Sequence, residues 1–225
     1  MNNLPEIIED TTTSEMIEWQ YFVSSVYKIN KPEFLSIKSI VIEHLNEAKK
    51  NFQFSHIGPL QDVPFYQTLN LIGETRLLDF MKYIGTTAAK ILSGQGYNMK
   101  LYDVVIYELW CQEHLKHSGQ EYHIHGNCQL SGFYFLECPE NSSKIVYHDP
   151  RPAKVYANLI ETNDTNVTNA SQAINFVPEV GTFMFSNSWL PHTFTQNNTS
   201  KSFKFVHFNL GVMPKRTVEK PAEVI

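Results

Sequence analysis

The feature that most constrains this chain is a change in its apolar pattern near residue 101. From there on, apolar residues alternate with polar ones or form short blocks separated by Pro, Gly and Asn, as in half-buried and buried strands. Short strands at this spacing predict a mainly β fold, a sandwich or jelly roll, rather than a parallel sheet with crossover helices. The expected strands are Tyr102–Trp110, Leu130–Leu136, Lys144–Tyr147, Lys154–Tyr156, Gly181–Phe185 and Phe203–Leu210.

The residues before this point have a helical pattern. A strand is expected at Tyr21–Tyr27, and a helix is expected to begin at Lys31–Pro32, because proline suits the first helical turn, and to end near Lys49–Lys50. A second amphipathic helix is expected over about Gly73–Leu92, where apolar residues recur every three or four positions. Both helices are expected to lie on a sheet.

Chain length and composition favour one domain over residues 1–225, with a helical flank at about 1–100 and a jelly-roll core at about 101–213. Hydrophobic residues make up 42% of the chain and charged residues 18%, so a large core can form. The net charge of −5 and the lack of a basic run argue against nucleic acid as a partner.

The cysteines and the apolar segments predict a cytoplasmic protein. Cys111, Cys128 and Cys138 are odd in number and form no C-x-x-C pair, so reduced thiols are expected rather than disulfides or a thiolate zinc site. No apolar stretch reaches the length of a membrane span, and the first residues, MNNLPEIIEDTTTSE, lack the pattern of a signal peptide. We therefore expect no membrane partner.

Histidines are the candidate ligands of a metal site. Five of the nine lie from His114 to His148, and in His123-Ile-His125 two imidazoles at i and i+2 point to the same side of a strand. His192 follows a predicted strand and presents a third imidazole from a distant part of the chain. Three neutral imidazoles suit iron, zinc, copper or nickel and leave coordination positions open for catalysis.

Six short motifs follow one another in the second half of the chain. They are the strand at Trp110, His123-Ile-His-Gly-Asn127, Leu130-Ser-Gly-Phe-Tyr134, Asp149-Pro-Arg151, Ser188-Trp-Leu-Pro-His192 and Phe208-Asn209. In type and order this set resembles the small 2-oxoglutarate/Fe(II)-dependent oxygenases of bacteria and phages. The resemblance implies a double-stranded β-helix, or jelly roll, with a helical flank. It also implies Fe(II) as cofactor, 2-oxoglutarate as cosubstrate and an oxygenase activity.

At the iron ligands this sequence departs from the usual pattern of the class. The class commonly uses two histidines and one carboxylate, with the first pair spaced as H-x-D. Here that slot reads His123-Ile-His125, and the favoured ligands are His123, His125 and His192. Two alternatives stay open: either His125-Gly-Asn127 fills the slot, or a carboxylate from elsewhere completes the site, such as Glu121 or Asp149.

A second departure concerns the far carboxylate of 2-oxoglutarate. The class commonly supplies an Arg after the last histidine, helped by a Tyr, and the aligned positions here are Phe203 and Phe135. Lys201 is two residues before Phe203 and is expected on the same face of an extended strand, so it is the first candidate. Arg151 is the second candidate, either as a bidentate carboxylate ligand or paired with Asp149 in a turn.

The sequence thus predicts an Fe(II)/2-oxoglutarate dioxygenase that hydroxylates a small molecule or a side chain and releases succinate and CO2. A cupin-like metalloprotein that does not use 2-oxoglutarate is the alternative, because two phenylalanines replace the polar groups of the cosubstrate pocket. Lys204 is expected in solvent, His207 as a hydrogen-bonded core residue, and Asn209 as a strand cap. A homo-oligomer is compatible with the sequence.

Overall fold

The computed structural model describes residues 22–50, 65–162 and 165–215. The segment MNNLPEIIEDTTTSE and Tyr21, on which two expectations rest, lie outside these residues. The helices are η1 (Pro32–Ile37), α1 (Lys38–Lys50), η2 (Thr75–Leu77), α2 (Leu78–Gly94) and α3 (Pro152–Tyr156). The strands are β1 (Val26–Asn30), β2 (Phe65–Gln67), β3 (Tyr102–His114), β4 (Gln120–His123), β5 (Leu130–Glu137), β6 (Ile145–His148), β7 (Ala173–Phe176), β8 (Thr182–Asn187), β9 (His192–Phe194) and β10 (Phe203–Pro214).

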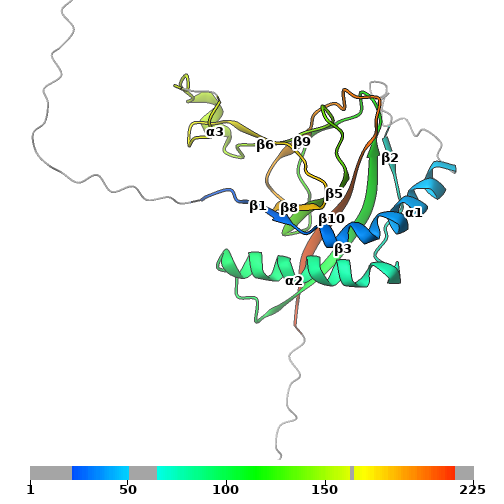
Figure 1. Ribbon diagram of the computed structural model, residues 1–225. Coiled ribbons are helices and arrows are strands. Elements are labelled where there is room, and N and C mark those ends of the chain that lie inside the picture. Colours follow the sequence, from blue (N-terminus) through cyan, green and yellow to red (C-terminus); the bar gives the residue numbers. More distant parts are fainter. Residues whose placement is uncertain (1–21, 51–64, 163–164, 216–225) are drawn as a thin grey trace, which may run out of the picture.

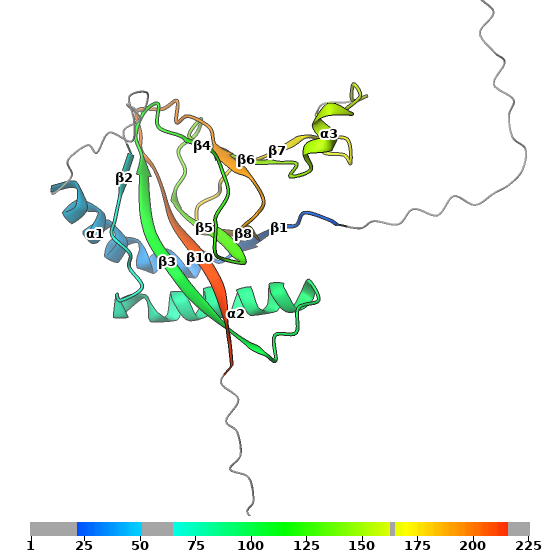
Figure 2. The same ribbon diagram turned by 180° about the vertical axis from the view of Figure 1, so that it is seen from behind.

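The strands form two antiparallel sheets, which confirms the mainly β, jelly-roll class. The major sheet has six strands in the order β1-β8-β5-β10-β3-β2, and the minor sheet has four in the order β4-β9-β6-β7. Strands β3 and β10 are long and curved, and they run side by side through the molecule (Figure 2). The predicted flank contributes strands as well as helices, because β1 and β2 form the two edges of the major sheet.

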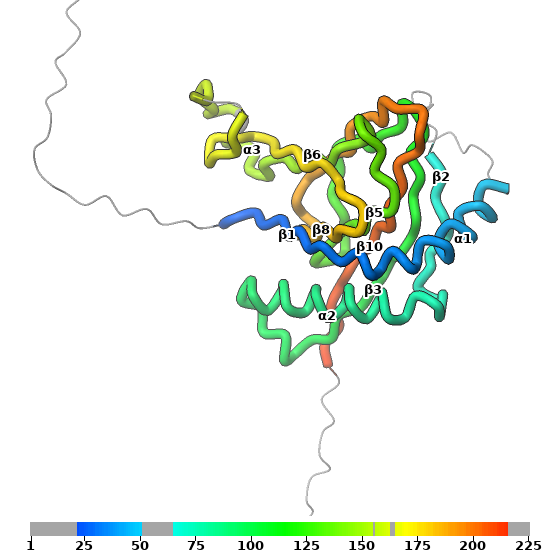
Figure 3. Tube along the Cα trace, viewed as in Figure 1, coloured from blue at the N-terminus to red at the C-terminus, as the bar shows by residue number. Residues whose placement is uncertain are grey.

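Helices α1 and α2 lie on the outer side of the major sheet (Figure 1), as the amphipathic pattern predicts. Strand β1 leads directly into η1 and α1, and α1 crosses the outer side of the sheet to contact β3 and β2 near its other edge (Figure 3). Val41 and Leu45 of α1 and Phe80 and Ile84 of α2 are buried in one cluster with outward-facing strand residues such as Phe183. Burying these side chains stabilises the layer of helices on the sheet.

A second cluster fills the space between the two sheets. It is largely aromatic, and its buried members are Phe133, Phe135, Ile145, Tyr147, Met184, Leu190, Phe194, Phe203 and Phe205. Phe194 of the minor sheet stacks on Phe205 of the major sheet with ring centroids 4.8 Å apart. This packing closes the interior of the jelly roll. The polar residues on the inner faces of the two sheets lie at one end of this interior.

Two sequence expectations are wrong in this region. The segment Lys154–Tyr156 is part of helix α3 rather than a strand, because Pro152 occupies the first helical turn, where proline is favoured. Lys204 is not solvated: its side chain is largely buried, and its Nζ pairs with Glu137 and lies 3.4 Å from Glu113 Oε1. Helix α3 and the loop after it project from the body beside β6 and β7 (Figure 2).

The three cysteines are free thiols, as expected. Over the ranges that the structure describes, no helix combines the length and the apolar character needed to cross a membrane.

Candidate active site

Three histidines from two strands and one loop meet at the end of the jelly roll. His123 ends β4, and the register places it directly opposite His192, the first residue of β9. His125 follows two residues after His123 in the loop that leaves β4. Their candidate ligand nitrogens all lie within 4.8 Å of one another, so the three imidazoles could hold one metal ion.

Hydrogen bonds on the far sides of two of these rings orient them. His192 Nδ1 lies 3.1 Å from the Leu190 carbonyl oxygen, and His123 Nδ1 lies 2.6 Å from the Glu121 carbonyl oxygen. A carbonyl only accepts, so each Nδ1 must donate its proton and each neutral ring keeps a lone pair on Nε2. This is the tautomer that a metal ligand requires, with the orienting contact that metal-bound histidines usually have.

His125 is held by a side chain that the sequence did not suggest. Asn209 Nδ2 lies 3.3 Å from His125 Nδ1 and 2.6 Å from Glu108 Oε2. The prediction that Asn209 caps a strand is wrong, because it lies within β10, on the same face as Phe205 and His207. Its alternation with His207 along the strand was the available signal, since His207 was already expected in the core.

Burial keeps two of the three imidazoles uncharged at neutral pH. Desolvation lowers the pKa of His125 to about 3, and the nearby His192 and His123 rings lower it further. Desolvation likewise lowers the pKa of His192 to about 4, and His123 and His148 act in the same direction. Because metal ions bind the neutral imidazole, these rings do not have to lose a proton first.

Two more aromatic side chains lie behind His125. The His207 ring lies 4.7 Å from that of His125 and 4.6 Å from that of Trp110, centroid to centroid. His207 is buried as expected, but its Nε2 has no hydrogen-bond partner, and neither has Trp110 Nε1. The two rings therefore present buried, unpaired nitrogen atoms next to the histidine cluster.

The three alternative ligands, Asp149, Glu121 and Asn127, lie outside the histidine cluster. Asp149 is paired with Arg151, with Oδ2 to Nη2 at 2.7 Å, and with Lys154 at 3.2 Å. Glu121 and Asn127 have exposed side chains, and Asn127 has a left-handed backbone with φ of 59°. None of the three joins the cluster that His123, His125 and His192 form.

The two candidate cations for 2-oxoglutarate lie outside the interior cluster. Strand β10 begins at Phe203, so Lys201 is in the preceding bend with its side chain exposed, and strand alternation does not extend to it. Arg151 is exposed and makes the predicted ion pair with Asp149. Phe203 and Phe135 face each other inside, with ring centroids 6.1 Å apart. Both cations remain predictions for the variants described below.

Arg151 also lines a pocket beside the site. This pocket has a volume of about 470 Å³, and its other lining residues include Tyr147, Leu190 and Val26. Tyr147 pairs directly with His192 in the register of β6 and β9, so the pocket approaches the histidines from the side of the minor sheet. Its size is within the range of small-molecule sites.

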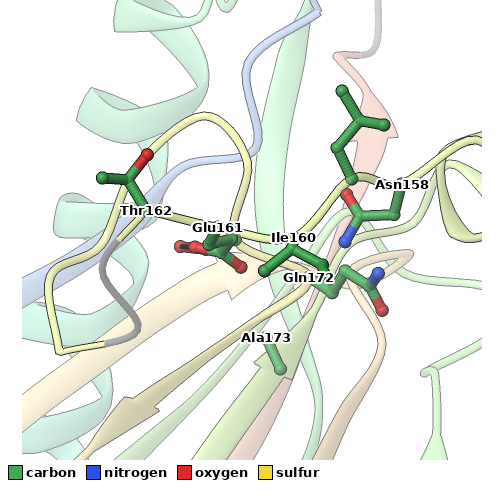
Figure 4. Close-up of a pocket in the computed structure, with 8 residues that line it drawn as sticks. Asn158, Ile160, Glu161, Thr162, Gln172 and Ala173 are labelled. Atoms are coloured by element: carbon green, nitrogen blue, oxygen red, sulfur yellow. Dashed lines mark hydrogen bonds between the residues drawn. The ribbon is translucent and has the colours of Figure 1, made fainter. Parts of the chain in front are cut away.

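A larger pocket lies farther out, in the projecting segment around α3. It has a volume of about 850 Å³ and is lined by residues of 158–162 and 171–173. Figure 4 shows Glu161, Asn158 and Gln172 along its wall. No histidine of the cluster lines it, so it is separate from the candidate metal centre.

Comparison with known proteins agrees with this architecture. A family model described as "Putative 2OG-Fe(II) oxygenase" matches residues 108–209. No curated protein matches the sequence.

Solved structures share the fold at low identity. They include the non-heme alpha ketoglutarate dependent carbocyclase SnoK from nogalamycin biosynthesis, with a TM-score of 0.59 and 10% identity over 88% of this chain and 85% of that one. AviO1 from Streptomyces viridochromogenes Tue57 has a TM-score of 0.58 and 13% identity over 88% and 91%. A Pseudomonas putida prolyl-4-hydroxylase has a TM-score of 0.54 and 10% identity over 84% and 92%.

The matched segment contains all three histidines and the motifs from Trp110 to Asn209. Residues 108–209 are therefore similar to the Fe(II)- and 2-oxoglutarate-dependent oxygenases, and the resemblance found in the sequence is confirmed. Fe(II) is the cofactor and 2-oxoglutarate the cosubstrate of this class. The donor set fits the metal, because iron accepts imidazole ligands and three of them leave coordination positions open.

Proposed function

We propose that the chain oxidises a C–H bond of a small molecule or side chain while 2-oxoglutarate is converted to succinate and CO2. In the simplest case one oxygen atom of O2 enters the substrate as a hydroxyl group and the other enters succinate. The observation that supports this most directly is the meeting of His123, His125 and His192 within 4.8 Å. Bound iron would supply the activation of dioxygen, which no side chain can perform.

The residues of this chain hold and shield the reacting groups. The Leu190 and Glu121 carbonyls and the Asn209 side chain fix the three imidazole rings. The aromatic cluster between the sheets excludes water behind the site, which limits side reactions of an oxidising centre. We place the substrate in the pocket beside Tyr147 and Leu190, because Tyr147 lines this pocket and lies against the His192 ring.

Reconstitution tests this proposal. The protein is loaded with Fe(II) without oxygen, and succinate is measured after 2-oxoglutarate and air are added. We expect succinate to form only with iron and oxygen, and to be lost in His192→Ala but retained in His117→Asn, which changes an exposed histidine. Iron-loaded wild-type protein that forms no succinate and binds no 2-oxoglutarate would contradict the proposal.

A cupin-like metalloprotein without 2-oxoglutarate remains the second candidate. The contact between Phe135 and Phe203 favours it, because two apolar rings occupy the positions where the class commonly has groups that bind a carboxylate. Calorimetry of 2-oxoglutarate with the metal-loaded protein separates the two functions. Absence of binding at millimolar concentration would favour the cupin-like function.

A further inference from the structure

A row of polar side chains crosses the inner face of the major sheet. Ser131 on β5 lies directly opposite Ser186 on β8 and opposite Asn209 on β10, and Asn209 in turn lies opposite Glu108 on β3. Residues opposite each other on neighbouring antiparallel strands point to the same face. Since Asn209 contacts His125, this row lies beside the histidine cluster.

Tyr147 approaches the same space from the minor sheet. It is paired with His192 in the strand register, and their ring centroids are 5.6 Å apart. The Tyr147 hydroxyl lies near the Ser186 hydroxyl. Tyr147 and Ser186 therefore bring hydroxyl groups together from the two sheets.

These hydroxyls are buried without a hydrogen-bond partner of normal geometry. Ser131 Oγ, Ser186 Oγ and Tyr147 Oη all lack one, and the three residues are 3% exposed or less. The buried hydroxyl of Tyr134, in contrast, is paired and donates to the Lys31 carbonyl oxygen. Unpaired buried polar groups are uncommon because they cost free energy. Three of them beside a metal site indicate a place for a polar ligand.

No cation accompanies these hydroxyls. The buried polar and charged residues that the structure describes include no Lys or Arg. Lys204 lies on the opposite face of β10 and is engaged by Glu137 and Glu113. A negatively charged ligand group placed in this space would therefore have to be bound by neutral donors.

The charge balance of the site makes neutral donors sufficient. Three neutral imidazoles add no charge to the two positive charges of Fe(II), and 2-oxoglutarate carries two negative charges. Metal and dicarboxylate together are therefore neutral without any charged side chain in the interior. A buried group that is neutral overall avoids the large cost of an unpaired charge. The replacement of a carboxylate ligand by histidine is thus consistent with the lack of an interior cation.

We propose that the hydroxyl groups of Ser131, Ser186 and Tyr147 bind the carboxylate of 2-oxoglutarate that does not chelate the metal. We call these three residues the hydroxyl cradle. The inference rests on the proposed function, because it assumes that 2-oxoglutarate is the cosubstrate. Hydroxyl groups donate short, strong hydrogen bonds to carboxylates, and the cradle offers three of them.

Calorimetry with the Ni(II)-loaded protein in the absence of iron tests the cradle. We expect Tyr147→Phe and the double variant Ser131→Ala/Ser186→Ala to lower the affinity for 2-oxoglutarate at least about 10-fold each, in line with the loss of a charge-assisted hydrogen bond. Their affinity for 2-oxobutyrate, which keeps the chelating end but has no second carboxylate, should stay within about 2-fold of wild type. Tyr134→Phe, a matched change of a buried tyrosine, should alter neither affinity.

Thermal unfolding gives a readout that needs no ligand. Tyr147→Phe removes an unpaired buried hydroxyl, so the metal-free variant should melt no lower than wild type, and up to about 2–4 °C higher. A lower melting temperature would show that the hydroxyl is already satisfied in the protein and would overturn the cradle.

Other outcomes also have a definite meaning. Wild-type affinity for 2-oxoglutarate in all cradle variants, or equal losses for 2-oxobutyrate, would overturn the cradle but leave the proposed function standing. A selective loss in Lys201→Ala or Arg151→Ala, with the cradle variants unaffected, would assign the carboxylate to that cation. If wild-type metal-loaded protein binds no 2-oxoglutarate, the proposed function falls together with the cradle.

Discussion

The Nε2 atoms of His125 and His192 face each other at 3.3 Å, although the two residues are 67 positions apart in the sequence. In the ring of His192 the other nitrogen is already engaged by the Leu190 carbonyl oxygen, so only Nε2 is available. Two imidazole nitrogens converging in this way, with His123 close by, share a small space that a metal ion fits.

The three histidines should act as one metal site. Replacing His123, His125 or His192 singly by Ala removes one of three ligands. Mutating a residue that only hydrogen-bonds a ligand typically lowers metal affinity roughly 10–100-fold, so the loss of a ligand should lower the affinity for Ni(II) or Fe(II) by more than that. Metal content after anaerobic dialysis measures this. His117→Asn should retain wild-type metal. Full occupancy in the His123 variant would exclude that residue as a ligand.

Asn209 should affect metal affinity by orienting the His125 ring, which it contacts. Asn209→Ala removes the side chain that lies 3.3 Å from His125 Nδ1, so the ring is less well oriented and metal affinity should fall roughly 10–100-fold. Asn175→Ala changes an exposed asparagine of β7 and serves as control. Titration of both variants with Ni(II) compares them. Equal affinities would show that Asn209 does not orient the ligand.

Stability should depend on pH through His114. Burial lowers the pKa of His114 to about 3, below the value of about 6.5 in an unfolded chain. Between these values the unfolded state binds a proton that the folded state does not, so stability is complete above pH 6.5 and falls as the pH is lowered. One such residue contributes up to about 1.4 kcal/mol per pH unit.

Urea unfolding of the metal-free protein between pH 4 and pH 7 measures this slope. His114→Gln should have a shallower dependence than wild type, whereas His117→Asn, at an exposed position, should have the wild-type slope. Identical slopes in His114→Gln and wild type would mean that the imidazole of His114 is protonated equally in both states.

Gly132 should tolerate no side chain. A Cβ there would lie 2.4 Å from the Met184 carbonyl oxygen and 2.5 Å from the Phe208 ring, so the paired strands β5 and β8 would have to separate. Gly132→Ala should cost about 3 kcal/mol or more, as overpacking in a core does. Gly126→Ala has open space around it and should stay within about 0.5 kcal/mol of wild type. Urea unfolding of both variants measures these two changes in the free energy of unfolding.

Local patterns were sufficient for most of the elements. The predicted helix at Lys31–Lys50 corresponds to η1 and α1, and the alternation of residues 203–210 corresponds to β10. Short elements were harder to predict: β9 has only three residues, and the pattern of Lys154–Tyr156 was compatible with both a strand and a helical turn. A three-residue segment contains too few positions to distinguish a period of two from one of 3.6.

The sequence by itself determined the class of fold, the H-x-H pair and the third imidazole at His192, because alternation on a strand and order along the chain are local properties. Only the tertiary structure decided what surrounds them. The pairing of β5 with β8 and β10 places Ser131 between Ser186 and Asn209, and the pairing of β6 with β9 places Tyr147 opposite His192. Register between distant strands depends on the packing of the whole interior, which no short stretch of sequence specifies.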